Sequence, residues 1–265
     1  MVAKNKETYF TKRLTEEVGQ ALLFFNPWQD FQVPEAQKYL IRTTGVYGSD
    51  LDLHILATLP AQQLINPLPS LKIFRSKLTQ YEWMEERNFK VPEWINLNGV
   101  DVLNVEKFFR LFPSGLVKPH IGQGGWGIEG MNWENFKTWW KKKRGVDESF
   151  ILQKFIPSAL ELRCFFIKGL PHIVLERRSK SNIAANFKQQ GLAKLATLPY
   201  GLESIVAKLI FESGLDYGAI DLLIEGDQVY FLDINSVPGI EQLEQVSGQN
   251  IIRNLLTANF FSQLF

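Results

Sequence analysis

Two aspartates and an asparagine near the end of the chain are residue types that could hold a divalent cation. Asp233 and Asn235 lie two positions apart in the run QVYFLDIN, so in a strand their side chains project from one face. The opposite face is predicted to carry Tyr230, Leu232 and Ile234. A turn at Gly226 returns the preceding run AIDLLI antiparallel, which places Asp221 beside the pair. Mg²⁺ prefers such oxygen ligands and keeps its remaining positions for water and phosphates.

A simpler reading of the same residues stays open. Aspartate and asparagine also end strands and begin turns, and Pro238-Gly239 follows Asn235 closely. Taken alone, the spacing does not separate a metal site from a strand end.

A glycine-rich stretch, KPHIGQGGWG from Lys118 to Gly127, has the composition of a phosphate-binding loop. Glycine lets backbone N–H groups approach phosphate oxygens, and the lysine adds a mobile positive charge. The stretch fits neither the GxxxxGK[ST] phosphate loop nor a dinucleotide fingerprint, because its spacing differs from both. A glycine-rich hairpin is the alternative. Lys77, on an expected helix, is a further candidate whose ordinary reading is a solvated side chain.

The run ILQKFIP and the strands after it offer a place for a flat base and for anions. A strand that ends at Pro157 exposes the backbone of Phe155 and Ile156, which could hydrogen-bond a base, although core packing of Phe155 is the alternative. Glu161 and Arg163 share one strand face, where an ion pair across the sheet is the simpler reading. Further along the chain, cationic and donor groups suited to an anion are expected at Arg177, Arg178, Asn186 and Lys188. The alternative is that these residues only form an exposed sheet rim.

The elements that must position these residues are read from hydrophobic period and from glycine and proline breaks. The first half is predicted to contain helices at 11–25, 71–87 and 133–143, a strand at 51–59 and a short strand at 116–118. The second half is predicted to be an antiparallel α+β unit, with strands in FILQKF, ELRCFFI, HIVLERR, AIDLLI and QVYFLDIN and a helix at 202–213. Gly169 and Gly226 are expected at hairpin turns.

Composition excludes several broad classes of protein. The chain has 265 residues, a formal net charge of +1 and 45% hydrophobic residues, so no broad field favours nucleic acid and nothing indicates disorder. The single cysteine, Cys164, excludes an intrachain disulfide framework and fits a reducing compartment. The polar start of the chain lacks an apolar signal core, and no run approaches the ~20 apolar residues of a membrane span. A cytoplasmic protein without membrane or nucleic-acid partners is expected.

The order of these features resembles the ATP-grasp superfamily, and within it the RimK-like and glutathione-synthetase-like carboxylate-amine ligases. The order is a helix lysine, a strand lysine with a glycine loop, a base-binding strand, acid-x-Arg, a basic strand, an acid, and acid-x-Asn. The closest local match is DINSVPGIEQLEQVSG, and the resemblance covers roughly residues 64–256. It implies an α+β fold in which two subdomains clasp ATP, after a short N-terminal α/β portion. The expected divisions are 1–70, 71–150 with the glycine-rich lid, and 151–265.

The resemblance also implies roles for individual residues. The implied ATP-binding residues are Lys77, Lys118, Gly122, Gly124, Gly125, Gln153, Phe155, Ile156 and Glu161. Those implied to neutralise the γ-phosphate or the acyl phosphate, or to lie beside the metals, are Arg163, Arg177 and Asn186. The implied metal ligands are Asp221, Asp233 and Asn235, which would hold two Mg²⁺ ions, with Mn²⁺ as a substitute.

The implied activity is an ADP-forming ligase with ATP as co-substrate, which phosphorylates a carboxylate and joins it to an amine. Amino acids or peptides are the expected substrates, and a homo-oligomer or a substrate-presenting protein is a further expected partner. The alternatives are a nucleotide-binding regulatory or assembly protein and an ATP-grasp kinase. Asp233 stands where the family more often has glutamate, and residues 184–185 and 188–191 replace a more arginine-rich stretch, which puts glutamate as a substrate in doubt.

Overall fold

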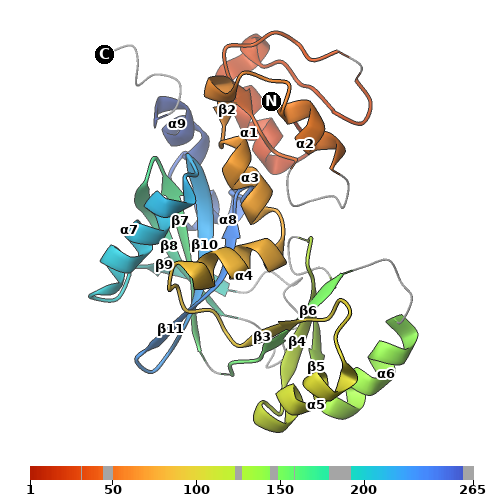
Figure 1. The fold of residues 1–265 in the computed structure, drawn as a ribbon. Helices are drawn as coiled ribbons and strands as arrows, with labels where there is room; N and C mark the ends of the chain where they lie inside the picture. Colours follow the sequence, from red (N-terminus) through yellow and green to blue (C-terminus); the bar gives the residue numbers. More distant parts are fainter. Residues whose placement is uncertain are drawn as a thin grey trace.

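Three β-sheets organise the chain in the computed structural model, which describes residues 1–30, 32–43, 50–122, 127–143, 149–157, 159–178 and 192–258. Figure 1 shows them as three regions: an N-terminal portion in red and orange, a lower yellow-green region with four strands, and a blue-green region with five. Helices α3 (Leu68–Phe74) and α4 (Lys77–Glu86) connect the N-terminal portion to the other two. No described helix has the length and apolar character needed to cross a membrane.

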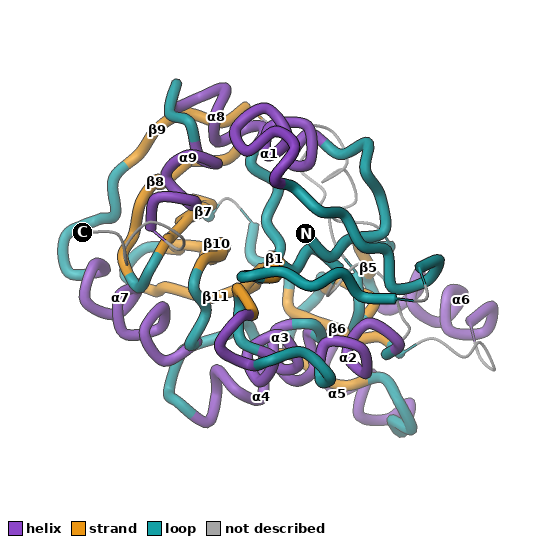
Figure 2. The backbone as a smooth tube through the Cα atoms, turned by 90° about the horizontal axis from the view of Figure 1, so that it is seen from above, coloured by secondary structure: helices purple, strands orange, loops and turns teal. Residues whose placement is uncertain are grey.

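The N-terminal portion differs from its predicted elements. Its helix α1 (Tyr9–Val18) begins at the N-cap Thr8, whose side chain accepts from the Thr11 amide, and it ends at Gly19, earlier than predicted. The predicted strand at 51–59 is wrong, because this segment forms helix α2 (Leu51–Leu56). The helix buries Asp52 and Leu56, which are four residues apart. A short apolar run does not distinguish the two kinds of element. Strand β1 (Tyr39–Leu40), labelled in Figure 2, pairs in parallel with β2 (Leu64–Ile65).

The single helix predicted at 71–87 is two helices in the structure. Helix α3 stops at Phe74 and α4 starts anew at Lys77, with Ser76 as the N-cap whose hydroxyl accepts from the Leu78 amide at 3.2 Å. The Lys77 amide instead donates to the carbonyl of His120 at 2.7 Å. This long-range contact, together with the cap, outweighs the continuous helical pattern. The break places Lys77 in the first turn of a helix.

The four-stranded sheet carries the aromatic-rich part of the chain. Its order is β3-β6-β4-β5, and its strands are β3 (Trp94–Asn96), β4 (Gly115–Pro119), β5 (Glu129–Met131) and β6 (Phe150–Lys154). Helices α5 (Val102–Leu111) and α6 (Trp133–Lys143), the second as predicted, cover it. The aromatic residues of the shared core are Phe108, Phe109, Phe136, Trp139 and Phe150. The division of the chain at 150/151 stays a prediction; β6, which straddles it, pairs with β3 and β4.

The five-stranded antiparallel sheet contains four of the five strands predicted for the second half of the chain. The fifth, FILQKF, is instead strand β6 of the four-stranded sheet, and the strand at Leu192–Ala196 is not predicted from the sequence. The order of the five-stranded sheet is β11-β10-β7-β8-β9, and its strands are β7 (Leu160–Ile167), β8 (Leu170–Arg178), β9 (Leu192–Ala196), β10 (Tyr217–Glu225) and β11 (Gln228–Asn235). Gly169 and Gly226 lie at its turns with positive φ, as predicted. Helices α7 (Leu202–Ser213) and α4 pack on one face. Helices α1, α8 (Glu241–Ser247) and α9 (Ile251–Leu256) pack on the other.

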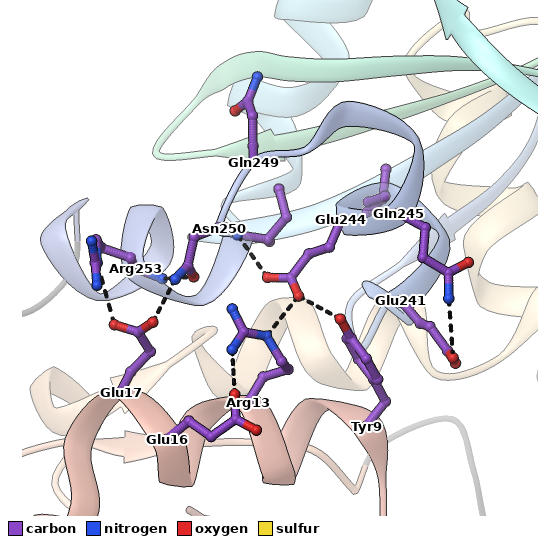
Figure 3. A network of polar contacts seen from close by, with 12 residues as sticks. Tyr9, Arg13, Glu16, Glu17, Glu241, Glu244, Gln245, Gln249, Asn250 and Arg253 are labelled. Atoms are coloured by element: carbon purple, nitrogen blue, oxygen red, sulfur yellow. Dashed lines mark hydrogen bonds and ion pairs between the residues drawn. The ribbon is translucent and has the colours of Figure 1, made fainter.

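A polar cluster fastens the N-terminal helix to the C-terminal helices. Figure 3 shows Glu244 of α8 accepting hydrogen bonds from Tyr9 Oη at 2.7 Å and from Arg13 Nε at 2.8 Å, both on α1. Its other oxygen accepts from the Ile251 amide at 2.8 Å. Burial would raise the pKa of Glu244, but the hydrogen bonds from Arg13, Tyr9 and the Ile251 amide outweigh it and lower the pKa. The segment that follows the predicted metal strand is thereby tied to the start of the chain.

Candidate functional site

Strand register brings the predicted acidic residues together. Asp221 of β10 is the cross-strand partner of Asp233 of β11, and Asn235 lies opposite Ala219. A bulge between Asp221 and Leu222 leaves Leu232 as the extra residue of β11. The two aspartates are therefore neighbours on adjacent strands, as the turn at 226 predicted.

The bulge also corrects the predicted faces of β11. Phe231 and Ile234, three residues apart, both belong to the core cluster under α4 and α7, so the alternation changes sides between them. The prediction that Tyr230, Leu232 and Ile234 share a face is therefore wrong. The extra residue changes the face on which the last side chains of β11 lie. Bulges next to functional sites commonly redirect side chains in this way.

Two arginines pair with Asp221, one from the adjacent strand β7 and one from the next strand, β8. Arg163 Nη1 of β7 lies 3.2 Å from Asp221 Oδ2, and Arg177 Nη1 of β8 lies 3.5 Å from Oδ1. Arg177 Nη1 also lies 3.1 Å from Glu161 Oε1. Burial raises the pKa of Glu161, although Arg177 and Arg163 oppose that shift. The acid-x-Arg pair of β7 is thus bonded to the strands on either side, which makes one charged row across the sheet.

Two lysines approach this row from other elements. Lys77 Nζ of α4 lies 3.4 Å from Asp233 Oδ1. Lys118 of β4 is 6% exposed, and its Nζ donates to Gln153 Oε1 of β6 at 2.6 Å. Burial lowers the pKa of Lys118 to about 7, and Lys77 acts in the same direction. Nearby carboxylates at Asp233, Glu161 and Asp221 oppose the shift. A buried lysine with this pKa gains its charge most readily when an anion lies beside it.

The strand predicted to hold a base is partly committed to internal contacts. Gln153 is 1% exposed and Ile156 is 5% exposed. The Phe155 amide donates to the carbonyl of Ser114 at 3.1 Å, so that donor serves the structure itself. Base contacts by Gln153, Phe155 and Ile156 stay predictions. The side chain of Gln153 nevertheless joins β6 to the buried lysine of β4.

The oxygen donors at the strand end fit Mg²⁺ by their chemistry. Asp221 and Asp233 supply two carboxylates on adjacent strands, and Mg²⁺ in nucleotide sites is commonly held by one or two carboxylates together with phosphates. Asn235 Oδ1 accepts from the Val237 amide at 3.0 Å, so this oxygen also caps the turn after β11. Among the described residues, no group of three His, Cys, Asp or Glu side chains is placed to hold a metal ion on its own. The donors fit an ion shared with a nucleotide.

Several of the predicted site residues lie outside the described residues or directly beside them. Gly124, Gly125 and Asn186 lie outside the described residues. Gly122 precedes the first of these gaps, and Gly127 follows it with φ +72°. A Cβ at Gly127 would lie 2.8 Å from Pro119 Cγ, so the return of the glycine-rich stretch beside β4 requires glycine there.

Two residues of α4 that the sequence reasoning did not single out hold the site elements together. Tyr81 Oη lies 2.5 Å from Gln153 Oε1 and 3.1 Å from the carbonyl oxygen of Leu232. The Ile234 amide donates to Gln80 Oε1 at 2.9 Å. The signal available in the sequence was spacing, because Tyr81 lies four residues after Lys77 and therefore on the same helix face.

The chain is similar in sequence to known proteins. The model of the RimK-like ATP-grasp domain matches residues 123–258. A probable alpha-L-glutamate ligase from Pasteurella multocida is 31% identical over 114 residues, which cover 42% of this chain and 36% of that protein. The matches to the first curated relatives cover less than two fifths of their length, 36% and 39%.

Solved structures show the same fold over nearly the whole chain. The RimK domain ATP-grasp protein of Sphaerobacter thermophilus superposes with a TM-score of 0.72 at 14% identity, over 98% of this chain and 97% of that one. The ATP-grasp ligase PsnB, in complex with a phosphomimetic variant of its minimal precursor, Mg and ADP, gives a TM-score of 0.71 at 13% identity, over 97% of both chains. The predicted α+β ATP-grasp fold is confirmed. The chain belongs to the RimK-like ATP-grasp family.

Proposed function

We propose that this protein is an ATP- and Mg²⁺-dependent ligase that activates a carboxylate as an acyl phosphate and joins it to an amine. The observation that carries the proposal is the charged row on β7, β8, β10 and β11, with Lys77 at its end. Ion pairs of 3.1–3.5 Å join Glu161, Arg177, Asp221 and Arg163. Lys77 pairs with Asp233 at 3.4 Å, and strand register places Asp233 opposite Asp221. Phosphoryl transfer to a carboxylate needs this kind of charge neutralisation and alignment, and no protein nucleophile.

Each group of residues has a separate task in this proposal. Asp221 and Asp233, with Asn235, hold Mg²⁺. A bound Mg²⁺ ion neutralises charge on the phosphates and orients them. Arg163 and Arg177 exchange part of their contact with Asp221 for the oxygens of the transferred phosphoryl group. Bidentate geometry and a permanent positive charge suit arginine to that role.

The nucleotide end of the proposed site lies at the lysines and Gln153. Lys77 and Lys118 contact phosphates, and Gln153 with the backbone of Ile156 holds the base. Glu161, whose carboxylate lies beside Arg177, accepts hydrogen bonds from the ribose hydroxyls. The glycine-rich stretch between 122 and 127 covers the triphosphate.

Amino acids and peptides are the proposed substrate class. The relatives include enzymes named as L-glutamate ligases, and PsnB was solved with a precursor. Glutamate itself is not proposed as the added amine, because residues 184–185 and 188–191 lack the arginines that the resemblance leads us to expect.

The test is ADP release with Mg²⁺ and ATP against panels of carboxylates, amino acids and peptides. Stimulation by one carboxylate with one amine is expected. Tight ATP binding with no stimulation by any pair would instead favour a nucleotide-binding regulatory protein. Release of a stable phosphorylated product without consumption of an amine would favour a kinase. Hydroxylamine separates the last two outcomes from a ligase, because it converts an acyl phosphate to a hydroxamate.

A further inference from the structure

The phenol of Tyr81 joins three elements that carry parts of the proposed ATP site. Tyr81 projects from α4, and its hydroxyl lies 2.5 Å from Gln153 Oε1 on β6 and 3.1 Å from the carbonyl oxygen of Leu232 on β11. Strand β6 belongs to the four-stranded sheet and β11 to the five-stranded sheet. One hydroxyl therefore connects the two sheets.

The residue is built to stay in that position and to remain a donor. Tyr81 is fully buried, and its ring packs edge to face on Trp94 of β3, with ring centroids 5.4 Å apart. Burial, and secondarily the charge of Asp233, raises the pKa of Tyr81, so the phenol keeps its proton. Its two acceptors share that proton.

The contact to β11 lies immediately before the proposed metal ligand. Strand β11 is an edge strand, and α4 satisfies its open edge on both sides of Asp233. Tyr81 bonds the carbonyl before Asp233, and Gln80 Oε1 accepts from the amide after it at 2.9 Å. The backbone of Asp233 is thus held against the helix whose first turn carries Lys77.

The contact to β6 lies at the other end of the proposed nucleotide. Gln153 Oε1 accepts from both Tyr81 Oη and Lys118 Nζ, at 2.5 Å and 2.6 Å. Both acceptor positions of this oxygen are therefore used, and the position of the amide is set by α4 and β4 together. The same hydroxyl that locates Gln153 also locates the strand of Asp233.

We propose that Tyr81 is a positioning residue that fixes the base end of the ATP site relative to its metal end. This inference rests on the proposed function, since it takes Gln153 as part of the base end and Asp233 as part of the metal end. A ligand that engages both ends gains from their correct spacing, whereas a fragment that engages only one end does not. Loss of the hydroxyl should consequently weaken the binding of ATP more than the binding of either fragment of ATP.

The test uses Tyr81→Phe, which keeps the buried ring and removes only the hydroxyl. Equilibrium binding of ATP, adenosine and inorganic triphosphate is measured by calorimetry with Mg²⁺ and without any acceptor. ATP should bind about five- to tenfold more weakly, the size of one lost hydrogen bond, while adenosine and triphosphate change less than about twofold. Equal weakening of all three ligands, or unchanged ATP binding, would overturn the positioning role.

Tyr217→Phe is the matched control. Tyr217 is also fully buried, and its hydroxyl donates to the carbonyl of Ile41 at 3.3 Å, in the core beside α1 rather than in the site. The Tyr217→Phe variant should lower the melting temperature about as much as Tyr81→Phe and leave ATP affinity unchanged. An equal loss of ATP affinity in this control would show a general effect of stability and would contradict the proposal.

A double variant removes dependence on folding differences. In a Gln153→Ala background, Tyr81→Phe should reduce ATP affinity clearly less than it does alone. The side chain of Gln153, one of the two groups that the hydroxyl positions, is already absent there. Additive effects would overturn the inference. Because binding is measured without an acceptor, failure of the ligase reaction leaves this test intact, whereas a wild-type protein that binds no ATP would contradict both proposals.

Discussion

Lys77 Nζ lies 3.4 Å from Asp233 Oδ1, although 156 residues separate the two in the chain. Lys77 occupies the first turn of α4 because Ser76 caps the helix and ends the run from α3. A cation is unfavourable at that end of a helix dipole, so the position gains from a neighbouring carboxylate or phosphate. The two side chains are 11% and 27% exposed, which leaves them accessible to a ligand. The helix break thus brings a lysine to the proposed metal strand.

Substitutions at Asp233 test this end of the site. Asp233→Asn keeps the size of the side chain but removes the charge that would hold Mg²⁺ and pair with Lys77, so ADP release should fall by at least about a hundredfold, as for removal of one electrostatic contact to a developing charge. Asp233→Glu keeps the charge on a side chain that is one methylene longer, so it should retain measurable turnover with a higher Mg²⁺ requirement. Equal activity of wild type and Asp233→Asn in a Mg²⁺ titration would exclude Asp233 as a ligand.

The second half of the fold was readable from the sequence because its signals are local. Strands β7, β8, β10 and β11 alternate in hydrophobicity and are bounded by turn glycines, and α6 and α7 have a clear helical period. Adjacent antiparallel strands then fix which residues are neighbours, so the pairing of Asp221 with Asp233 followed.

The features of the fold that residue period does not predict depend on contacts between residues distant in the chain. Helix α2 is fixed by Asp52, which is 1% exposed and bonds Arg75 at 3.0 Å and Thr43 at 2.9 Å. No local pattern shows that a buried aspartate will meet an arginine 23 residues later. The bulge at Leu232 is set by the register of two strands, and the interruption before Lys77 by a bond to His120. Such features follow from the assembled fold rather than from residue period.

The buried Lys118 should make ATP binding depend on pH. Burial lowers its pKa to about 7, and triphosphate beside it would raise that pKa again. Binding should therefore take up a proton above pH 7, and affinity should fall as the pH rises further. Calorimetry at pH 8 in two buffers of different ionisation enthalpy measures this uptake. Lys118→Met should abolish it, and equal proton uptake in this variant would assign the effect to another group.

The same shift has a consequence for stability with a definite sign. Between the folded pKa of about 7 and the ordinary value of 10.5, the unfolded chain binds a proton at Lys118 that the folded chain does not. The contribution of this residue to the free energy of unfolding therefore rises with pH across that window. The melting temperature of the wild type should therefore rise relative to that of Lys118→Met from pH 7 to pH 9. A constant difference would contradict the lowered pKa.

Glu244 should make the attachment of the N-terminal helix sensitive to acid. Its pKa is lowered in the fold because bonds from Arg13 and Tyr9 outweigh burial, so its stabilisation is present above the ordinary value of 4.5 and lost as the pH falls through the folded pKa. Glu244→Gln should cost about 1–3 kcal/mol at pH 7 and progressively less as the pH falls below 4.5. Thermal melting across that range measures this change in cost. Glu241→Gln is the control and should melt like wild type, because Glu241 is exposed and Figure 3 shows it bonded to Gln245 rather than to α1.

Gly218 should be required for the close approach of β10 to its neighbours at the metal end. A Cβ there would lie 2.6 Å from Phe166 Cζ and 3.0 Å from the carbonyl oxygen of Asn235. Gly218→Ala should cost about 1–3 kcal/mol by overpacking and also raise the Mg²⁺ concentration needed for activity, because Asn235 must shift. Gly239→Ala meets nothing within 4 Å and serves as the control. A destabilised Gly218→Ala with normal Mg²⁺ dependence would separate Asn235 from metal binding.

The central claim is that the row of Asp221, Asp233, Arg163 and Arg177 supports transfer of a phosphoryl group from ATP to a substrate carboxylate. The most direct measurement uses the carboxylate that stimulates ADP release, labelled with ¹⁸O in its carboxyl group, together with its amine. Transfer through an acyl phosphate predicts that one labelled oxygen appears in the inorganic phosphate formed in each turnover, as detected by mass spectrometry. Product formation with unlabelled phosphate, or with label in AMP instead, would contradict it.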